Sequence, residues 1–398
     1  MILTLLLDLD DTLLNTNQDV FFPAYLNALT ASFVPAFASD AGAVSSALLS
    51  GTAAMFQNSN SSRTLKEVFA DSFCPQVGMS MEELETHIGD FYSRVFPSLQ
   101  SMTSQNPQAK AFVDWARSQG FRLVVATDPI LPRAATYHRV RWAGLDPEPF
   151  ELISTFDDFH FTKTHTAYYA EVLGRAGWQE GPVLMVGNDM ERDILPAQRL
   201  GLATFFVEAE PGSKSGPEAG LRGSLPDLRR YLESADIASL IPSFTSKESI
   251  VAIHSSTPAV LDSMTRGLSP EAWKQKSFAD GWTMTELACH LRDTEREIHH
   301  MQLKLFENGA EPFIPRPDTG VWASQRDYLH EDGPAVFGEF YAARNATLEL
   351  LNNAAEDQWE KKARHAIFGP TNFREVAGFI ADHDRLHVHQ AWSLLKKL

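Results

Sequence analysis

Two aspartates with one residue between them stand directly after the first apolar run of the chain. The run Leu5–Leu7 predicts a buried β-strand, and Asp8 and Asp10 follow it. Because alternate residues of an extended chain point to the same side, both carboxylates would lie side by side at the carboxyl edge of a sheet. Open α/β folds bind their ligands at that edge. A carboxylate there could attack phosphorus, although an ordinary acidic turn accounts for the local pattern equally well.

Three later segments place polar side chains after apolar stretches. A second strand is predicted within 121–129 and ends at Thr127, and Lys163 follows a strand-and-loop stretch. A third predicted strand, within 183–193, leads into Asn188, Asp189 and Asp193. The chain therefore presents acids, a hydroxyl, a lysine and more acids, in that order, over about 200 residues.

This order resembles the four motifs of the haloacid dehalogenase-like (HAD-like) hydrolase superfamily. The resemblance implies that Asp8 is a nucleophile that forms an aspartyl-phosphate, and that Asp10 protonates the leaving oxygen. It implies that Thr127 and Lys163 bind the phosphoryl oxygens as negative charge develops on them. It also implies a Mg²⁺ ion held by the Asp8 carboxylate, the Asp10 carbonyl and acids after Val186, since carboxylate and carbonyl oxygens suit this hard cation.

The last motif departs from the usual pattern of that family. Gly187 is followed by Asn188 and then by Asp189. Either Asn188 takes the place of the first acid in a longer spacing, or Asp189 pairs with Asp193 in a shorter one. We favour Asp189 and Asp193 as the acidic pair, with Asn188 as a further direct ligand of Mg²⁺.

Asp10 also distinguishes between branches of the superfamily. A halide leaves without a proton, whereas the alkoxide of a phosphate ester needs one, so an acid at this position favours a phosphatase over a dehalogenase. We expect a small phosphorylated metabolite as the substrate. The long insert after Leu14 indicates a helical cap of the C1 type at about 16–105. Its sequence is apolar and poor in Lys and Arg, which disfavours a polyanionic substrate.

The two halves of the chain differ in pattern. For residues 1–243 we expect a HAD-like domain with a Rossmann-like parallel sheet and the helical cap. After a Ser-rich connector, strand signals become scarce and helical periodicity dominates. For residues 244–398 we therefore expect an all-α domain, a four-helix bundle. The predicted fold class is α/β plus all-α.

Three histidines fall on predicted inward faces of helices in the second half. His383 and His387 lie one turn apart on the apolar stripe of the last segment, and His290 lies on that of an earlier one. Three imidazoles that converge inside a bundle could hold a transition metal. The two stripes are Val376, Phe379, Ile380, Leu386, Ala391 and Leu394, and Leu287, Leu291, Thr294, Ile298 and Met301.

Segments 281–293 and 383–390 resemble the DinB-like (YfiT-like) four-helix bundles. The resemblance covers about 150 residues and implies that His290, His383 and His387 bind Zn²⁺, Ni²⁺ or Mn²⁺. Because that family includes thiol-dependent transferases, it also suggests a low-molecular-weight thiol as a partner. Five further histidines of this half are expected at the surface or in loops: His299, His300, His330, His365 and His389.

Composition narrows the classes of partner. With 34 Lys+Arg against 51 Asp+Glu, the chain lacks the basic field that contact with a nucleic-acid backbone requires. The two cysteines, Cys74 and Cys289, provide no disulfide framework. The first apolar run has no basic start and breaks at Asp8, which argues against a signal peptide or a membrane span. We expect a cytoplasmic protein without a nucleic-acid or membrane partner.

Two functional hypotheses follow from the sequence. In the first, the chain is bifunctional: a Mg²⁺-dependent phosphatase is fused to a metal-binding bundle with thiol-transferase or hydrolase chemistry. In the second, only the HAD-like half catalyses, and the bundle is a structural module, through which the chain could form a homodimer.

Overall fold

The computed structural model describes residues 1–37, 40–208, 220–276, 281–307 and 311–397. They form two compact units. Unit 1 comprises Met1–Val172 and Glu180–Pro242, and unit 2 comprises Leu173–Gln179 and Ser243–Leu398. Residues 173–179 group with unit 2, which a single boundary near residue 243 does not account for.

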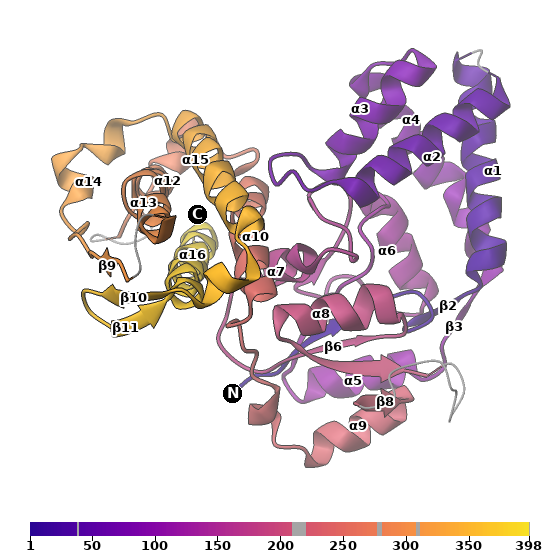
Figure 1. The fold of residues 1–398 in the computed structure, drawn as a ribbon. Helices are drawn as coiled ribbons and strands as arrows, with labels where there is room; N and C mark the ends of the chain where they lie inside the picture. The colour runs from indigo at the N-terminus through magenta and orange to yellow at the C-terminus, as the bar shows by residue number, and fades with distance from the viewer. Residues whose placement is uncertain (38–39, 209–219, 277–280, 308–310, 398) are drawn as a thin grey trace. The chain divides into compact units, whose positions relative to one another are not determined.

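Unit 1 is built on a six-stranded parallel sheet with the strand order β5-β4-β1-β6-β7-β8 (Figure 1). The strands are β1 (Thr4–Leu7), β4 (Arg122–Val125), β5 (Leu152–Ile153), β6 (Val183–Gly187), β7 (Ala203–Val207) and β8 (Leu221–Gly223). Leu7 of β1 lies opposite Val125 of β4 and Val186 of β6. The residues that follow these three strands therefore reach the same edge of the sheet.

Helices cover both faces of this sheet. Outside the cap, the helices of this part of the chain are α5 (Ala109–Ser118), α6 (Arg133–Trp142), α7 (Thr166–Arg175), α8 (Leu195–Leu200), α9 (Leu225–Ser234) and the shorter segments η2 (Met190–Ile194) and η3 (Ile237–Leu240). Figure 1 shows α8 on one face and α5 and α9 on the other. In α5 the apolar residues Phe112, Val113 and Ala116 recur on one side and are buried, as expected for an amphipathic helix.

A helical cap is inserted between β2 (Leu14–Thr16) and β3 (Thr103–Gln105), which pair antiparallel. It consists of α1 (Gln18–Phe37), α2 (Ala41–Gln57), α3 (Leu65–Val77), α4 (Met81–Arg94) and η1 (Phe96–Met102). Capping boxes begin α3 and α4, because Thr64 and Ser80 exchange hydrogen bonds with the third residue of each helix. The prediction of a parallel sheet with a helical cap is confirmed.

Unit 2 is mainly helical. Its longer helices are α10 (Lys247–Thr265), α12 (Met284–Thr294), α15 (Gly333–Asn353) and α16 (Phe373–Leu395). α12 packs on α15 and α10 packs on α16, which gives the predicted helical bundle. The shorter helices are α11 (Pro270–Trp273), η4 (Glu295–His299), α13 (His300–Lys304), η5 (Leu305–Glu307), α14 (Trp322–Gln325), η6 (Tyr328–His330) and η7 (Glu356–Glu360).

A small sheet that the sequence did not predict also belongs to unit 2. It joins β9 (Phe313–Ile314), β10 (Lys362–His365) and β11 (Gly369–Asn372). β10 pairs parallel with β9 and antiparallel with β11. The β10–β11 hairpin leads directly into α16, whose first turn is capped by the Asn372 side chain.

Two predicted core positions of the bundle are wrong. Met301 is 53% exposed and Leu386 is 62% exposed. The segment η4 is a π-helical turn, so the residues after it are rotated by about 100° from the α-helical register, and Gln302 and Leu303 are buried instead. In α16, Leu386 lies on the outer side, and Asp384, two residues earlier and therefore on the opposite side of the helix, is fully buried.

Asp384 is part of a buried ionic network that joins three helical segments. The Arg344 guanidinium donates from Nε to Glu295 Oε1 at 2.9 Å and from Nη2 to Asp384 Oδ1 at 3.0 Å. All three side chains have 0% exposure. This network ties α15, η4 and α16 together behind the predicted metal-binding histidines.

Within the described part of the chain, no helix is both long and apolar enough to cross a bilayer.

Candidate active site and metal centre

The carboxyl edge of the parallel sheet brings the four predicted motifs of unit 1 together. Asp8 follows β1, Thr127 follows β4, and Asn188 follows β6, so the strand register places all three at one edge. Lys163 reaches the same place from the loop before α7, and Asp193 reaches it from η2. All five line a pocket of about 570 Å³.

Lys163 is the central cation of this pocket. Its Nζ lies 2.6 Å from Asp8 Oδ1 and also pairs with the Asp193 carboxylate. The side chain is 3% exposed, and burial alone would favour its neutral form. The Asp193 and Asp8 charges outweigh that burial and raise the pKa of Lys163 well above its usual value. A buried ammonium therefore stands beside the predicted nucleophile.

Asp193 organises the loop after β6. Its Oδ2 accepts hydrogen bonds at 2.9 Å from the backbone nitrogens of both Asn188 and Asp189. A Cβ at Gly187 would collide with the Asp193 side chain, so only glycine allows this close approach. Burial, together with the neighbouring Asp8 charge, raises the pKa of Asp193.

Asn188, and not Asp189, faces Asp8 and Asp10. One terminal atom of the Asn188 amide lies 3.0 Å from the Asp10 carbonyl oxygen and 3.3 Å from Asp8 Oδ2. The Asp189 carboxylate turns away instead, because its Oδ1 accepts from the backbone nitrogens of Glu191 and Arg192 and so caps η2.

The separations around Asn188 fit a bound Mg²⁺. Octahedral coordination at about 2.0–2.1 Å places neighbouring ligand oxygens about 3 Å apart. The oxygens of Asp8 and Asp10 and the Asn188 amide already meet at such distances. Without a cation, the amide nitrogen donates to both oxygens; with one, the amide can turn its own oxygen towards it.

Asp10 has a partner that the sequence did not reveal. Its carboxylate forms an ion pair with Arg139, which projects from α6 and is 5% exposed. Burial lowers the pKa of the Arg139 guanidinium to about 10, so it remains a cation near neutral pH. A basic residue among the buried positions of α6 could have indicated a buried ion pair. The sequence did not identify Asp10 as its partner, because α6 and Asp10 are more than 120 residues apart.

Thr127 and Asp128 complete the floor of the pocket. The Thr127 carbonyl accepts from Ser154 Oγ at 2.6 Å and from Tyr168 Oη at 2.8 Å, which fixes the backbone where β4 ends. Asp128 Oδ1 accepts from the backbone nitrogen of Lys163 at 3.2 Å. Burial raises the pKa of Asp128. The order of the motifs in the sequence does not indicate a role for this carboxylate.

In unit 2 the three predicted histidines converge. Nε2 of His290 on α12 lies 3.2 Å from Nε2 of His383 on α16, and one ligand atom of His290, His383 and His387 can be chosen so that all three lie within 4.8 Å of one another. A tetrahedral metal with nitrogen ligands at 2.0–2.1 Å would separate them by about 3.4 Å. Burial lowers the pKa of His290 to about 2 and that of His383 to about 3. Both rings are therefore neutral near pH 7, which is the form that binds metals.

Neighbouring side chains orient these rings. His387 Nδ1 lies 2.9 Å from Gln390 Oε1, which leaves Nε2 for a metal. Trp282 stacks on the His387 ring with a centroid separation of 6.0 Å. Burial also lowers the pKa of His387, so all three rings are neutral near pH 7. Three neutral imidazoles, with no carboxylate in the group, suit Zn²⁺, Ni²⁺ and similar ions.

Two histidines that were expected at the surface are buried. His299 is 7% exposed, and its ring lies 4.7 Å from that of His383. The π-helical turn η4 rotates it inwards, where its Nδ1 contacts Glu295 at 3.3 Å. His365, also 7% exposed, sits at the end of β10. Sequence periodicity missed both, as well as the fully buried His254 of α10.

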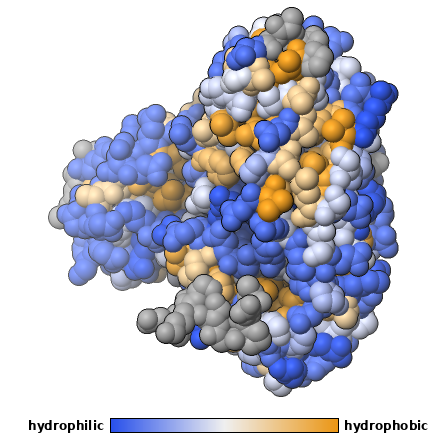
Figure 2. Space-filling view, turned by 90° about the vertical axis from the view of Figure 1, so that its right-hand side faces the viewer, coloured by the Kyte–Doolittle hydropathy of each residue, from blue (hydrophilic) through white to orange (hydrophobic). Residues whose placement is uncertain are grey.

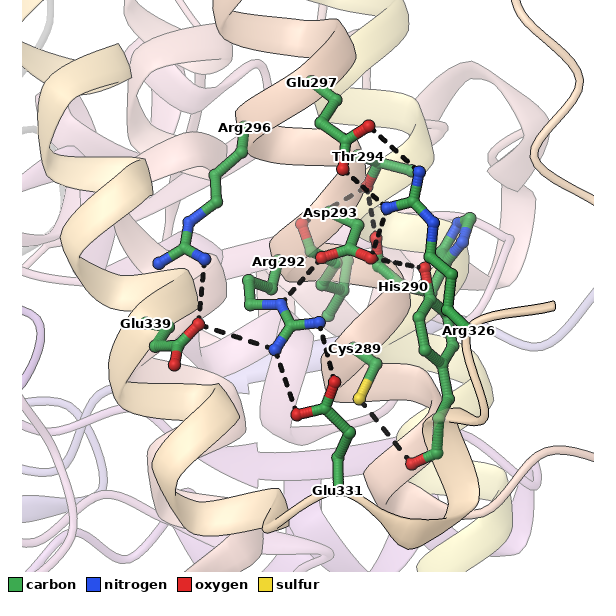
Figure 3. Close-up of polar contacts among 12 residues, drawn as sticks. Cys289, His290, Arg292, Asp293, Thr294, Arg296, Glu297, Arg326, Glu331 and Glu339 are labelled. Atoms are coloured by element: carbon green, nitrogen blue, oxygen red, sulfur yellow. Dashed lines mark hydrogen bonds and ion pairs between the residues drawn. The ribbon is translucent and has the colours of Figure 1, made fainter. Parts of the chain in front are cut away.

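The outer side of α12 is held by a polar network (Figure 3). Asp293 accepts at 2.7 Å from each of Arg292 Nε, Arg326 Nη1 and Tyr328 Oη. On the far side of Arg292, Figure 3 shows the carboxylates of Glu331 and Glu339. These contacts fix the rotation of the helix that carries His290.

Comparisons with known families agree with the two-part architecture. Residues 5–207 match the haloacid dehalogenase-like hydrolase family, and residues 254–391 match the DinB superfamily. A comparison with curated proteins finds no match.

Several solved structures resemble one part of the chain each. A HAD phosphatase from Thermococcus onnurineus is 16% identical, covers 58% of this chain and 98% of its own, and has a TM-score of 0.40. A 2-haloacid dehalogenase from Pseudomonas syringae is 19% identical, covers 58% of this chain and 99% of its own, and has a TM-score of 0.41. YfiT from Bacillus subtilis is described as a probable metal-dependent hydrolase with an unusual four-helix bundle topology. It is 17% identical, covers 39% of this chain and 88% of its own, and has a TM-score of 0.35.

The HAD-like match covers 203 of the 398 residues, which is more than half of the chain. The chain therefore belongs to the haloacid dehalogenase-like hydrolases.

Proposed function

We propose that unit 1 is a phosphatase that hydrolyses a small phosphorylated metabolite through an aspartyl-phosphate at Asp8. One observation carries the proposal: a second acid, Asp10, lines the same pocket as Asp8 and Lys163. A leaving alkoxide needs a proton, and a carboxyl group beside the nucleophile can supply it. This arrangement favours a phosphatase over the dehalogenase branch of the family.

The proposed reaction has two steps. Asp8 attacks phosphorus, the bond to the leaving oxygen breaks, and Asp10 gives that oxygen a proton. Asp10 then takes a proton from a water molecule, which attacks phosphorus and releases inorganic phosphate and free Asp8. Lys163 and Thr127 bind the phosphoryl oxygens, on which negative charge builds up.

Mg²⁺ is the proposed cofactor of this site. The Asp8 carboxylate, the Asp10 carbonyl and Asn188 would hold it, and Asp193 holds the loop that presents Asn188. Bound there, the cation offsets the negative charge of the acids and of the substrate. Asp189, which we had favoured as a ligand, has the weaker support because its carboxylate caps η2.

Replacing the nucleophile tests this proposal. Asp8→Asn should abolish hydrolysis of 4-nitrophenyl phosphate, because an amide cannot form the acyl-phosphate. The exposed Asp114→Asn on α5, a change of the same kind outside the pocket, serves as the control. Turnover at the wild-type rate in Asp8→Asn would contradict the proposal.

For unit 2 we propose a divalent transition-metal site formed by His290, His383 and His387. Zn²⁺, Ni²⁺ or Mn²⁺ would retain an open position there for water, a substrate or a low-molecular-weight thiol, and so support hydrolytic or thiol-transfer chemistry. The convergence of three neutral imidazoles supports this bifunctional hypothesis. A bundle that only stabilises or dimerises the chain is the alternative.

Metal analysis separates these two hypotheses. The first predicts one tightly bound transition metal per chain, which is lost in His383→Ala and kept in His330→Ala, where an exposed histidine is removed. Metal-free, folded and dimeric wild-type protein would favour the structural alternative.

A further inference from the structure

The catalytic pocket of unit 1 continues into a mainly apolar cavity between the cap helices and the residues Ile130, Pro132 and Phe156. A second, more enclosed cavity of about 40 Å³ lies next to the catalytic one. The two share four lining residues, namely Phe22, Tyr25, Thr52 and Ile130. A molecule bound at Asp8 can therefore extend into the cap.

Most of the residues that line the inner cavity are apolar, and Tyr25, Thr52 and Tyr92 add hydroxyl groups. α1 contributes Leu26, Leu29 and Phe33, and α2 contributes Leu48 and Met55. A lining that is mainly apolar favours apolar occupants.

The hydroxyl groups of Tyr25, Thr52 and Tyr92 in this lining already have hydrogen-bond partners within the protein. Tyr25 and Tyr92 share a hydrogen bond of 2.6 Å between their Oη atoms. Burial raises the pKa of Tyr25 to about 12, so its ring stays neutral. Thr52 Oγ1 donates to the Leu48 carbonyl at 2.9 Å. These groups offer little to the polar atoms of a ligand.

The charges around the two cavities also select against a second anionic group. Of the cap side chains that the structure describes in the two linings, none is a lysine, arginine or histidine, and Asp19 adds a negative charge. The core cations Lys163 and Arg139 already face carboxylates. Arg192 stacks on Phe56 of α2 and lies 3.7 Å from Asp128.

Hydrophobic residues also reach the outer surface of the cap. Figure 2 shows that hydrophobic side chains gather on the upper part of the face that carries α1. Val20 and Phe22 are 51% and 38% exposed. Phe22 belongs to both linings, so the apolar character continues from the surface to the catalytic pocket.

We propose that the substrate is a phosphate monoester of an uncharged, apolar alcohol, whose hydrocarbon end enters the cap cavity. This inference rests on the proposed phosphatase function and specifies its substrate class. The phosphoryl group lies between Asp8, Thr127 and Lys163, and the leaving oxygen lies towards Asp10. The hydrocarbon then passes Phe22 and Thr52.

A series of n-alkyl phosphates tests this inference on the full-length wild-type protein with Mg²⁺. Their leaving groups have nearly equal basicity, so differences in kcat/KM report binding of the chain. From ethyl to pentyl phosphate, kcat/KM should rise by about fourfold for each added methylene that enters the cavity. Glycerol 1-phosphate and 3-phosphoglycerate, which are polar or carry a second anion, should be hydrolysed at least tenfold less efficiently than butyl phosphate.

A matched pair of variants locates the effect in the cavity. Leu26→Lys adds an ammonium to a half-buried position that lines only the inner cavity, and Asn27→Lys adds the same charge one residue later on the exposed side of α1. In Leu26→Lys, kcat/KM should no longer rise with the length of the alkyl chain, and the difference in kcat/KM between butyl phosphate and 3-phosphoglycerate should become smaller. Asn27→Lys should retain the wild-type pattern.

The outcomes separate this inference from the proposed function. If 4-nitrophenyl phosphate is hydrolysed but 3-phosphoglycerate or glycerol 1-phosphate surpasses butyl phosphate, the substrate class is wrong and the phosphatase stands. A chain-length dependence that is unchanged in folded Leu26→Lys would likewise overturn the role of the cavity. If the wild type hydrolyses none of these phosphates, the proposed function fails, and this inference fails with it.

Discussion

At the scale of single residues, the sequence predicted which residues form the candidate site, but it did not predict the directions in which all of their side chains point. Asp8, Thr127 and Lys163 were proposed from motif order alone, and the structure brings them into one pocket. Asn188 and Asp189 both line that pocket, and which of them lies beside Asp8 and Asp10 depends on a tight loop that motif spacing cannot resolve. The backbone nitrogens of η2 attract the Asp189 carboxylate and leave Asn188 towards Asp8.

Two substitutions test this assignment. Asn188→Asp adds a carboxylate beside Asp8 and Asp10, and it should lower the Mg²⁺ concentration needed for half-maximal activity by about tenfold, because affinity rises with ligand charge. Asp189→Asn should change that concentration by less than about twofold. If Asp189→Asn strongly raised the Mg²⁺ concentration needed for half-maximal activity, and Asn188→Asp left it unchanged, the assignment would be reversed.

We propose that Arg139, which forms an ion pair with Asp10, positions that carboxyl group. An adjacent cation lowers the pKa of a carboxyl group, so removing it should raise the pKa of Asp10. In Arg139→Met, the limb of the pH profile that depends on Asp10 should therefore move to higher pH for butyl phosphate. With 4-nitrophenyl phosphate, whose leaving group needs no proton, the rate should change by less than about threefold.

Arg141→Met provides the matched control for that experiment. Arg141 lies on the same helix, half exposed beside Glu148, and its removal should leave both pH profiles unchanged. Equal losses on both substrates in Arg139→Met would indicate a structural role only.

At the scale of elements, periodicity predicted the helices well and failed where one helix changes its geometry. The π-helical turn η4 adds a residue to one turn between α12 and α13. It exposes Met301 and brings His299 against His383. The buried carboxylate of Asp384 is a second exception, because its partner Arg344 comes from another helix. No pattern within one helix encodes such a partner.

The Arg344 network should be critical for the bundle. Arg344→Met leaves Glu295 and Asp384 buried without their cation, which should lower the stability of unit 2 by about 3–5 kcal/mol. Hydrogen exchange at the amides of α16 would measure this loss. Arg296→Met, which breaks an exposed pair with Glu339, should cost less than about 0.5 kcal/mol. Similar protection in both variants would show that the network contributes little.

At the scale of the whole molecule, the chain carries two polar centres of different chemistry. The oxygen-rich pocket of unit 1 suits Mg²⁺, and the three imidazoles of unit 2 suit a softer transition metal. The division into an α/β part and a helical part was predictable from the change in periodicity. The grouping of residues 173–179 with unit 2 was not, because it depends on contacts between segments far apart in the sequence.

Removing a histidine ligand should affect only one of the two centres. A metal present at 100 times its dissociation constant stabilises the folded form by about 2.7 kcal/mol, so His383→Ala should uncover a separate, earlier melting transition of unit 2. Hydrolysis of 4-nitrophenyl phosphate should stay within about twofold of the wild type. A parallel loss of phosphatase activity in a folded His383→Ala protein would contradict the independence of the two centres.

The central claim is that Asp8 becomes phosphorylated during turnover, and an acid-quench experiment tests it most directly. The protein is mixed with ³²P-labelled butyl phosphate and Mg²⁺ and quenched in acid within milliseconds, because acyl-phosphates survive acid and are cleaved by hydroxylamine. We predict protein-bound, hydroxylamine-labile label on the peptide that contains Asp8, and none in Asp8→Asn. Rapid release of phosphate with no label on the protein, or label on another residue, would contradict the account.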